Sequence, residues 1–414
     1  MVVEGGNGNS GKRQWWWLWQ TVAVAVVKGG GSVCITNAQL QPKVFDVFQY
    51  GAVADGKTDN SKAFSKAWNE SCKWQGRSSV LIPLGSYFLN SLVLSGPCNG
   101  PVELLIKGVL KAPSEPAQFL NTHNWIIIQA VQNLRITGGG TLDGQGASGW
   151  SFNTCSTGHC PGLPASMLLY FINNSEISHI NSLNSKNVHL NIFGCRDMNL
   201  SQIGISAPGD SPNTDGIHIS ASTNIRLSVM NIATGDDCVS LGPENRRIHI
   251  SKSFCGPGHG ISVGSLGRTD EEQHVTRLVV TNCTFTRTLN GLRIKTWAGA
   301  PNDGGGVVSN MLFDSIVVND VSSPINIDQQ YCPFPPCRQD SSLIQIANIT
   351  FSNIQGTSAT REAVKLVCSE SKPGKNIVLE NINLKYLGHE GPAISTCAHA
   401  NVISRGQVIP PACS

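Results

Sequence analysis

The stretch "NTDGIHISASTNIRLSVMNIATGDDCVSLG" (213–242) contains one full cycle of a pattern that repeats through most of this 414-residue chain. Within it, "NIRLSVMNI" (224–232) alternates β-branched and polar residues, as a half-buried β-strand does. Similar runs recur at 247–254, 277–285, 310–318, 346–354 and 376–384. A second family, at 215–220, 237–242, 259–264, 290–295 and 323–328, recurs at intervals of about 22 to 34 residues.

A repeat of this length, with no competing helical period, is typical of a solenoid. Because each cycle holds several short strands, the pattern predicts an all-β fold, a parallel β-helix in which each coil pairs with the next. Asn residues near the strand ends are expected to hydrogen-bond from coil to coil. A β-propeller is the main alternative, but its blades need about 40 residues each.

An N-terminal helical cap is expected at "DNSKAFSKAWNESCKW" (59–74), where apolar residues follow a helical spacing after a capping residue. Solenoids need such a cover over the apolar end of the stack. Residues 39–414 are therefore expected to form a single β-helix catalytic domain.

The first 38 residues have the layout of a secretory signal peptide. Lys12 and Arg13 precede the apolar run 15–27, and an A-x-A-like site follows at 36–38. The run is short for a membrane span, which needs roughly twenty residues, although an uncleaved anchor is an alternative. We expect an extracellular protein with no stable membrane association.

Fourteen cysteines fit a secreted, oxidised chain. Short separations suggest the pairs Cys72–Cys98, Cys155–Cys160, Cys238–Cys255, Cys332–Cys337 and Cys397–Cys413. Cys34 would leave with the signal, and Cys195, Cys283 and Cys368 would be free. No CxxC spacing supports a zinc site. Glycosylation sequons that agree with export occur at Asn69, Asn173, Asn199, Asn282 and Asn348.

The charge pattern does not favour nucleic-acid binding. The formal net charge is only +3, and there is no Lys/Arg run or aromatic platform.

Three aspartates are expected to gather on one side of the solenoid. Asp215 lies one cycle before Asp236 and Asp237, and His259 lies one cycle after Asp237. Because stacked coils are about 4.8 Å apart, these side chains should be close neighbours. Arg293 and Lys295 alternate with apolar residues in "LRIK", so both should face the same side on the next coil. The other histidines, including His218 and His249, are expected to be structural.

This cluster suits the cleavage of an acidic sugar polymer. Crowded carboxylates raise the pKa of at least one member, which leaves a proton beside ionised partners. A protonated acid and an ionised carboxylate are the groups that cleave a glycosidic bond. Arg293 and Lys295 are suited to a substrate carboxylate.

Each part of the cluster also has a plainer interpretation. Asp236 and Asp237 could be turn residues or Ca²⁺ ligands. His259, between two glycines, could mark a tight turn. Arg293 and Lys295 could form a surface ion-pair ladder. The shared register of all these positions favours the catalytic interpretation.

In this setting the sequence resembles the plant polygalacturonases of glycoside hydrolase family 28. The resemblance rests on "NTD" (213–215), "GDD" (235–237), "GHG" (258–260) and "RIK" (293–295), in that order and spacing. It extends over roughly residues 44–414 and includes 45–64 and 138–146. It implies a right-handed parallel β-helix that hydrolyses α-1,4 linkages between galacturonates with inversion, without a metal or other cofactor.

The resemblance also implies roles for single residues. Asp236 would be the general acid, Asp215 and Asp237 would hold and activate water, and His259 would tune the protonation of the acid.

Substrate binding would involve four further residues. Arg293 and Lys295 would bind a galacturonate carboxylate, Asn213 would support the pocket, and Tyr331 in "IDQQY" would contact substrate. Many plant members carry a further cysteine soon after the position of Cys368. This chain has no cysteine at 369–376.

The expected partner is therefore an anionic polysaccharide, homogalacturonan, which a monomeric enzyme would meet in the cell wall. Rival functions are a pectate lyase, which would need Ca²⁺, and a rhamnogalacturonan or xylogalacturonan hydrolase of the same family. An inactive wall-polysaccharide-binding or structural protein is a rival from a different class.

Overall fold

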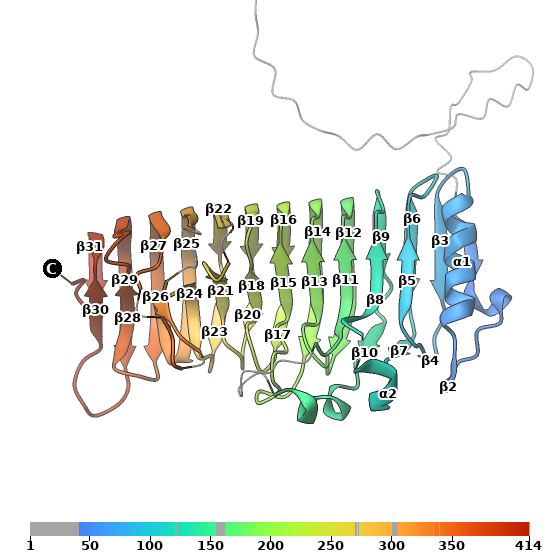
Figure 1. Ribbon diagram of the computed structural model, residues 1–414, viewed down its shortest axis with the longest axis horizontal. Helices are drawn as coiled ribbons and strands as arrows, with labels where there is room; N and C mark the ends of the chain where they lie inside the picture. The colour runs from blue at the N-terminus through green and yellow to red at the C-terminus, as the bar shows by residue number, and fades with distance from the viewer. Residues whose placement is uncertain are drawn as a thin grey trace, which may run out of the picture. The chain divides into compact units, whose positions relative to one another are not determined.

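The computed structural model describes residues 41–120, 122–154, 162–269, 271, 273–299, 305–333, 335–338 and 340–413. The predicted signal peptide and the predicted Cys155–Cys160 pair lie outside these residues. From Lys43 onward the strands form one continuous stack of coils, seen from the side in Figure 1.

Two parallel sheets make up the described stack. The eleven-stranded sheet comprises β5 (Leu92–Ser95), β8 (Asn124–Gln129), β11 (Ala165–Tyr170), β13 (Leu190–Phe193), β15 (Ile217–Ser220), β18 (Val239–Leu241), β21 (Ile261–Leu266), β24 (Asn290–Trp297), β26 (Ser323–Tyr331), β28 (Glu362–Val367) and β30 (Ile394–Ala398).

The other, twenty-stranded sheet comprises β1 (Lys43–Asp46), β2 (Asp55–Asp59), β3 (Ser78–Ile82), β4 (Ser86–Phe88), β6 (Val102–Ile106), β7 (Val109–Lys111), β9 (Leu134–Thr137), β10 (Thr141–Asp143), β12 (Asn173–Leu183), β14 (Arg196–Ser206), β16 (Thr223–Ser228), β17 (Asn231–Ala233), β19 (Asn245–Ser251), β20 (Phe254–Cys255), β22 (Gln273–Thr281), β23 (Thr284–Thr286), β25 (Gly306–Val321), β27 (Ile344–Ser358), β29 (Gly374–Tyr386) and β31 (Ala400–Ile409). Short helices α2 (Pro116–Phe119), η1 (Val47–Tyr50), η2 (Gly146–Ser148) and η3 (Trp150–Phe152) lie between strands.

Stacked apolar side chains fill the interior between the sheets. Ile217, Val239, Ile261, Leu292 and Ile325 occupy matching positions on five successive strands of the eleven-stranded sheet. All five are at most 2 % exposed. Each strand thus buries the side chains of one face and points those of the other face outward. The predicted parallel β-helix is confirmed.

Asparagine stacks follow a corner of the coils, as predicted. Nδ2 of Asn348 donates to Oδ1 of Asn310 at 3.4 Å, and Nδ2 of Asn376 donates to Oδ1 of Asn348 at 2.8 Å. All three residues have φ between 51° and 57°. Asn tolerates this left-handed conformation because its short polar side chain can bond locally.

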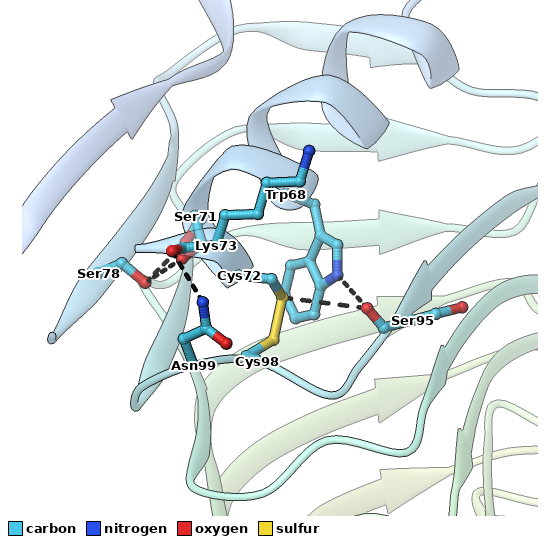
Figure 2. The surroundings of a disulfide bond; sticks show 8 residues. All are labelled: Trp68, Ser71, Cys72, Lys73, Ser78, Ser95, Cys98 and Asn99. Carbon is cyan, nitrogen blue, oxygen red and sulfur yellow. Dashed lines mark hydrogen bonds between the residues drawn. A yellow bond between two sulfur atoms is a disulfide. The ribbon is translucent and has the colours of Figure 1, made fainter. Parts of the chain in front are cut away.

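The N-terminal cap is α1 (Ser61–Lys73), which buries Phe64 and Trp68 against the first coils. The N-cap residue is Asn60, one position after the expected Asp59, and its side chain makes no capping hydrogen bond. Asp59 still accepts a hydrogen bond from the backbone N–H of Ser61 at 3.0 Å. Nε1 of Trp68 donates to the carbonyl of Ser95 at 3.0 Å, beside the Cys72–Cys98 disulfide (Figure 2). The cap therefore covers the apolar end of the stack.

Four predicted disulfides are present: Cys72–Cys98, Cys238–Cys255, Cys332–Cys337 and Cys397–Cys413. Cys195, Cys283 and Cys368 are free and buried, also as predicted. No helix among the described residues is long and apolar enough to cross a membrane.

Candidate active site

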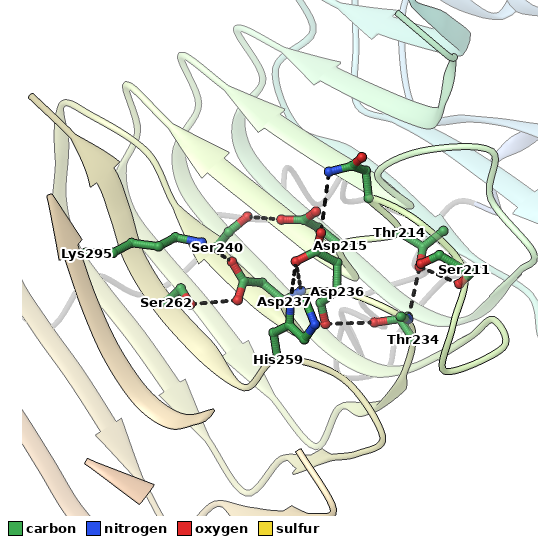
Figure 3. Close-up of polar contacts among 12 residues, drawn as sticks. Ser211, Thr214, Asp215, Thr234, Asp236, Asp237, Ser240, His259, Ser262 and Lys295 are labelled. Carbon is green, nitrogen blue, oxygen red and sulfur yellow. Dashed lines mark hydrogen bonds and ion pairs between the residues drawn. The ribbon is translucent and has the colours of Figure 1, made fainter. Parts of the chain in front are cut away.

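The three aspartates and His259 come together, as the repeat predicts (Figure 3). Asp215 immediately precedes β15, the Asp236–Asp237 pair precedes β18, and His259 precedes β21. The backbone N–H of Gly216 donates to the carbonyl of Asp237 at 2.9 Å, and that of His259 donates to the carbonyl of Asp236 at 2.8 Å. Hydrogen bonds between coils thus hold the strand entries one above another.

Asp237 is buried in an ion pair that spans two further coils. Its Oδ2 accepts from Nζ of Lys295 at 2.8 Å, and its Oδ1 accepts from Oγ of Ser262 at 2.6 Å. Burial by itself lowers the pKa of Lys295, but attraction to Asp237 outweighs it and raises that pKa. Both oxygens of Asp237 therefore have a hydrogen-bond donor.

Asp236 pairs with His259, whose Nδ1 donates to Oδ1 at 2.9 Å. The backbone N–H of Asp237 also donates to this oxygen, at 2.8 Å. Burial opposes ionisation of both residues. The hydrogen bond and charge of the pair outweigh burial, so the pKa of Asp236 falls and that of His259 rises. The pair therefore favours the ionised form of Asp236 and the protonated form of His259.

Asp215 has the opposite tendency. Burial, then repulsion from Asp236 and Asp237, raises its pKa well above the ordinary value. One acid of the cluster is therefore poised to hold a proton, as predicted. That acid is Asp215, whereas the resemblance gives the general-acid role to Asp236; the assignment of roles stays a prediction.

His218 is a member of this network that the sequence analysis assigned to structure alone. Oγ of Ser240 lies 2.7 Å from Oδ2 of Asp215, and 2.8 Å from Nδ1 of His218. Nε2 of His218 in turn lies 2.8 Å from Oγ of Ser220. Burial lowers the pKa of His218 to about 4, so the ring is neutral near pH 7. The signal in the sequence is the 22-residue interval that places His218 opposite Ser240.

Asn213 lies beside Asp236, with its Nδ2 3.5 Å from Oδ2 of the aspartate. Nδ2 of Asn153 donates to Oδ1 of Asn213 at 2.9 Å, which orients the amide. Asn153 follows η3, in a segment outside the repeat, and the sequence analysis did not select it.

Arg293 and Lys295 share the outward face of β24, as predicted. Arg293 is paired in register with Ser262 of the preceding coil. The guanidinium carbon of Arg293 lies 5.0 Å from the ring centre of Tyr331, and Nζ of Lys295 lies 5.5 Å from it. The four expected substrate-binding residues, Asn213, Arg293, Lys295 and Tyr331, therefore border the acids.

Asp236, Asp237 and His259 have ligand atoms within 4.8 Å of one another, as a metal site would. However, the ammonium of Lys295 and the hydroxyl of Ser262 already occupy both oxygens of Asp237. A cation bound there would also meet the positive charge of Lys295. These donors therefore fit an ion-pair network better than a metal centre.

Comparison with known proteins identifies the family of this chain. The model of the family "Glycosyl hydrolases family 28" matches residues 72–406, which include all the site residues above. The chain belongs to this family. Family 28 relatives include a polygalacturonase from Gossypium barbadense, 43 % identical over 92 % of this chain and 93 % of that protein. An exopolygalacturonase from Arabidopsis thaliana is 44 % identical over 89 % of this chain and 83 % of that protein.

Solved structures share the fold of this chain. The endo-xylogalacturonan hydrolase of Aspergillus tubingensis superimposes with a TM-score of 0.75, covering 88 % of this chain and all of that one, at 24 % identity. At that level of identity the likeness concerns the fold alone.

Proposed function

We propose that this family 28 protein hydrolyses the α-1,4-galacturonosyl linkages of polygalacturonate by an inverting acid/base mechanism. The observation that carries the proposal is the stack of Asp215, Asp236 and Asp237 beside the cations Arg293 and Lys295. Three carboxyls can divide the work of acid and base. The neighbouring cations suit the carboxylate that every galacturonate unit carries.

The three carboxyls share one proton in this mechanism. At rest the proton is on Asp215, where burial favours the neutral form. When sugar displaces water, the proton moves to Asp236, which gives it to the glycosidic oxygen as the bond breaks. Ionised Asp215, with Asp237, orients the attacking water and accepts its proton. The resting distribution of protons is thereby restored.

The cations hold the reacting groups in place. Lys295 pairs with Asp237 at 2.8 Å, and with Arg293 and Tyr331 it borders the place of the substrate carboxylate. His259 bonds to Oδ1 of Asp236, so the sugar would meet Oδ2, which lies 3.5 Å from Nδ2 of Asn213. The signal at 1–38, the single domain 39–414, the monomeric state and action in the cell wall remain part of the same proposal.

Product analysis on de-esterified polygalacturonate tests this function. We expect saturated galacturonate products, with monomer alone for exo cleavage and a ladder of oligomers for endo cleavage. Activity should survive EDTA, because the cluster is occupied by Lys295 rather than suited to a metal. An unsaturated, ultraviolet-absorbing product that requires Ca²⁺ would identify a lyase instead. Turnover only on rhamnogalacturonan or xylogalacturonan would favour those rivals.

The variant Asp236→Asn tests the acid. Removing a general acid typically costs 10²–10⁴-fold, so we expect turnover to fall by about a thousand-fold with circular dichroism unchanged. Glu176→Gln is the matched control, because Glu176 is exposed on the outer side of β12. Near-normal turnover in Asp236→Asn would remove Asp236 from the acid role.

A further inference from the structure

A second cationic pocket adjoins the proposed substrate site. Arg268, Trp297, Gly299 and Arg338 contribute to the lining of a cavity of about 220 Å³. None of these residues has a part in the chemistry described above.

The pocket continues the line of cations and rings that begins at Arg293. Trp297 follows Lys295 on the same outward face of β24, and its ring centre is 5.4 Å from that of Tyr331. Arg268 follows β21, the strand that pairs with β24. Its guanidinium carbon lies 5.2 Å from the ring centre of Trp297. Tyr331 also lies 5.0 Å from the guanidinium carbon of Arg293, so Trp297 and Tyr331 link the pocket to the first site.

Unsatisfied donors in this region indicate an acceptor ligand. Nε1 of Trp297 and Nε of Arg293 are buried without a hydrogen-bond partner among the described residues. Buried donors in native structures are normally paired, so each such atom requires an explanation. An anionic oxygen ligand between Arg293 and the pocket would satisfy both.

The charge balance of the pocket is positive. No carboxylate of the described residues pairs with Arg268, whose guanidinium lies over the ring of Trp297. Nε of Arg338 lies 3.4 Å from Oδ2 of Asp340, but both side chains are more than half exposed. Exposed pairs contribute little, so Asp340 leaves Arg338 largely available to an anion.

Gly299 brings the Arg338 segment to the pocket. Its φ is +70°, and a Cβ atom there would lie 2.8 Å from Cβ of Asp340 and 3.3 Å from Cβ of Arg338. The Cys332–Cys337 disulfide constrains the same segment directly before Arg338. The side chain of Arg338 thus follows a segment that a disulfide constrains.

We propose that this pocket binds the carboxylate of a second uronic-acid unit of the same polysaccharide, next to the unit held by Arg293 and Lys295. The inference rests on the proposed function and deepens it. The enzyme would then prefer a run of consecutive unesterified galacturonates, because a methyl ester at the second unit removes the charge that Arg268 meets. Trp297 would donate its N–H and present its ring to the sugar.

The test compares Arg268→Gln with the parent protein, both carrying Asp236→Asn so that oligosaccharides bind without turnover. Calorimetry would measure the affinity for monomeric galacturonate, tetragalacturonate and methyl-esterified tetragalacturonate. A charge-assisted hydrogen bond contributes about 1.5–3 kcal/mol, so we expect a loss of about tenfold or more for tetragalacturonate. Monomeric galacturonate, which can fill only the first site, should bind equally to both proteins. The esterified tetramer should show a much smaller loss.

Two further variants sharpen the result. Trp297→Phe keeps a ring but removes the N–H, and we expect a several-fold loss for the tetramer only. Arg246→Gln on β19, an exposed arginine of the other sheet, is the matched control and should change nothing. Circular dichroism would check that each variant folds.

Equal affinities of Arg268→Gln and its parent for every oligomer would overturn the pocket proposal, as would equal losses for every length. Neither outcome touches the proposed function, which is judged separately by hydrolysis of polygalacturonate with the unmodified protein. Failure of that hydrolysis would remove the proposed function, whatever the binding data show.

Discussion

Asp215 shows how one residue can combine catalytic use with a cost to stability. Burial and two neighbouring aspartates favour its neutral form in the folded protein, whereas the unfolded chain ionises it at the ordinary pKa. Between these two pKa values the folded state binds more protons. The stability of the fold therefore decreases as pH rises through that interval.

Asp215→Asn should accordingly stabilise the protein while abolishing turnover. The amide oxygen can still accept from Ser240, and the amide does not ionise. We expect the melting temperature of the variant to exceed that of the parent at pH 7, with a smaller difference at pH 4. Thermal melts at both pH values measure this. A variant that melts lower than the parent at pH 7 would contradict the assignment of the raised pKa to Asp215.

At the scale of elements, a buried lysine fastens the loops beside the acids. Lys186 lies between β12 and β13, and its Nζ donates to the carbonyls of Pro113 and Gly144, both at 2.6 Å. The ammonium is 4.6 Å from the ring centre of Phe119. Burial lowers the pKa of Lys186 to about 8. One side chain thus joins three connections, and the same loop reaches Asp215 through the N–H of His189.

Lys186→Met should destabilise the fold although it buries a more apolar group. The change leaves the carbonyls of Pro113 and Gly144 without their donor, at about 1–3 kcal/mol each. We expect a total loss of about 2–4 kcal/mol in the free energy of unfolding, measured by denaturant titration. Lys107→Met is the control, because Lys107 is exposed. Equal stability of the two variants would mean that the hydrogen bonds of Lys186 do not stabilise the fold.

At the scale of the whole stack, each coil contacts only its neighbours, so the ends decide whether the apolar interior meets water. Helix α1 covers the first coils with Trp68, which is 1 % exposed, whereas Trp74 at the end of the helix is 45 % exposed. The cap is separated from the acids by several coils along the stack (Figure 1). Stability and catalysis are therefore separable at this end.

Trp68→Ala should lower the free energy of unfolding by about 3–5 kcal/mol, the usual cost of removing a buried tryptophan. Trp74→Ala should cost much less, because its ring is already half in water. Thermal melts of both variants provide the comparison, and kcat on polygalacturonate at low temperature should be unchanged in each. A large loss of kcat in folded Trp68→Ala would show that the cap does influence the site.

Much of the architecture could be predicted because the chain repeats. A strand period of two and a coil of about 22 residues place Asp215, Asp237 and His259 one above another, with stacked strands about 4.8 Å apart. The disulfides over short separations follow from the same closeness along the chain. These features depend on local periodicity, which can be recognised in the amino-acid sequence.

The position of the proton and the second cationic pocket were decided only by the tertiary structure. The proton depends on burial and on charges from several coils, so the identity of the three acids cannot rank their pKa values. The pocket lies where the pairing of β24 with both neighbours shifts register, after Val263 on one side and after Lys295 on the other. Such a shift interrupts the repeat, so the repeat does not predict that residues such as Arg268 and Trp297 come into contact.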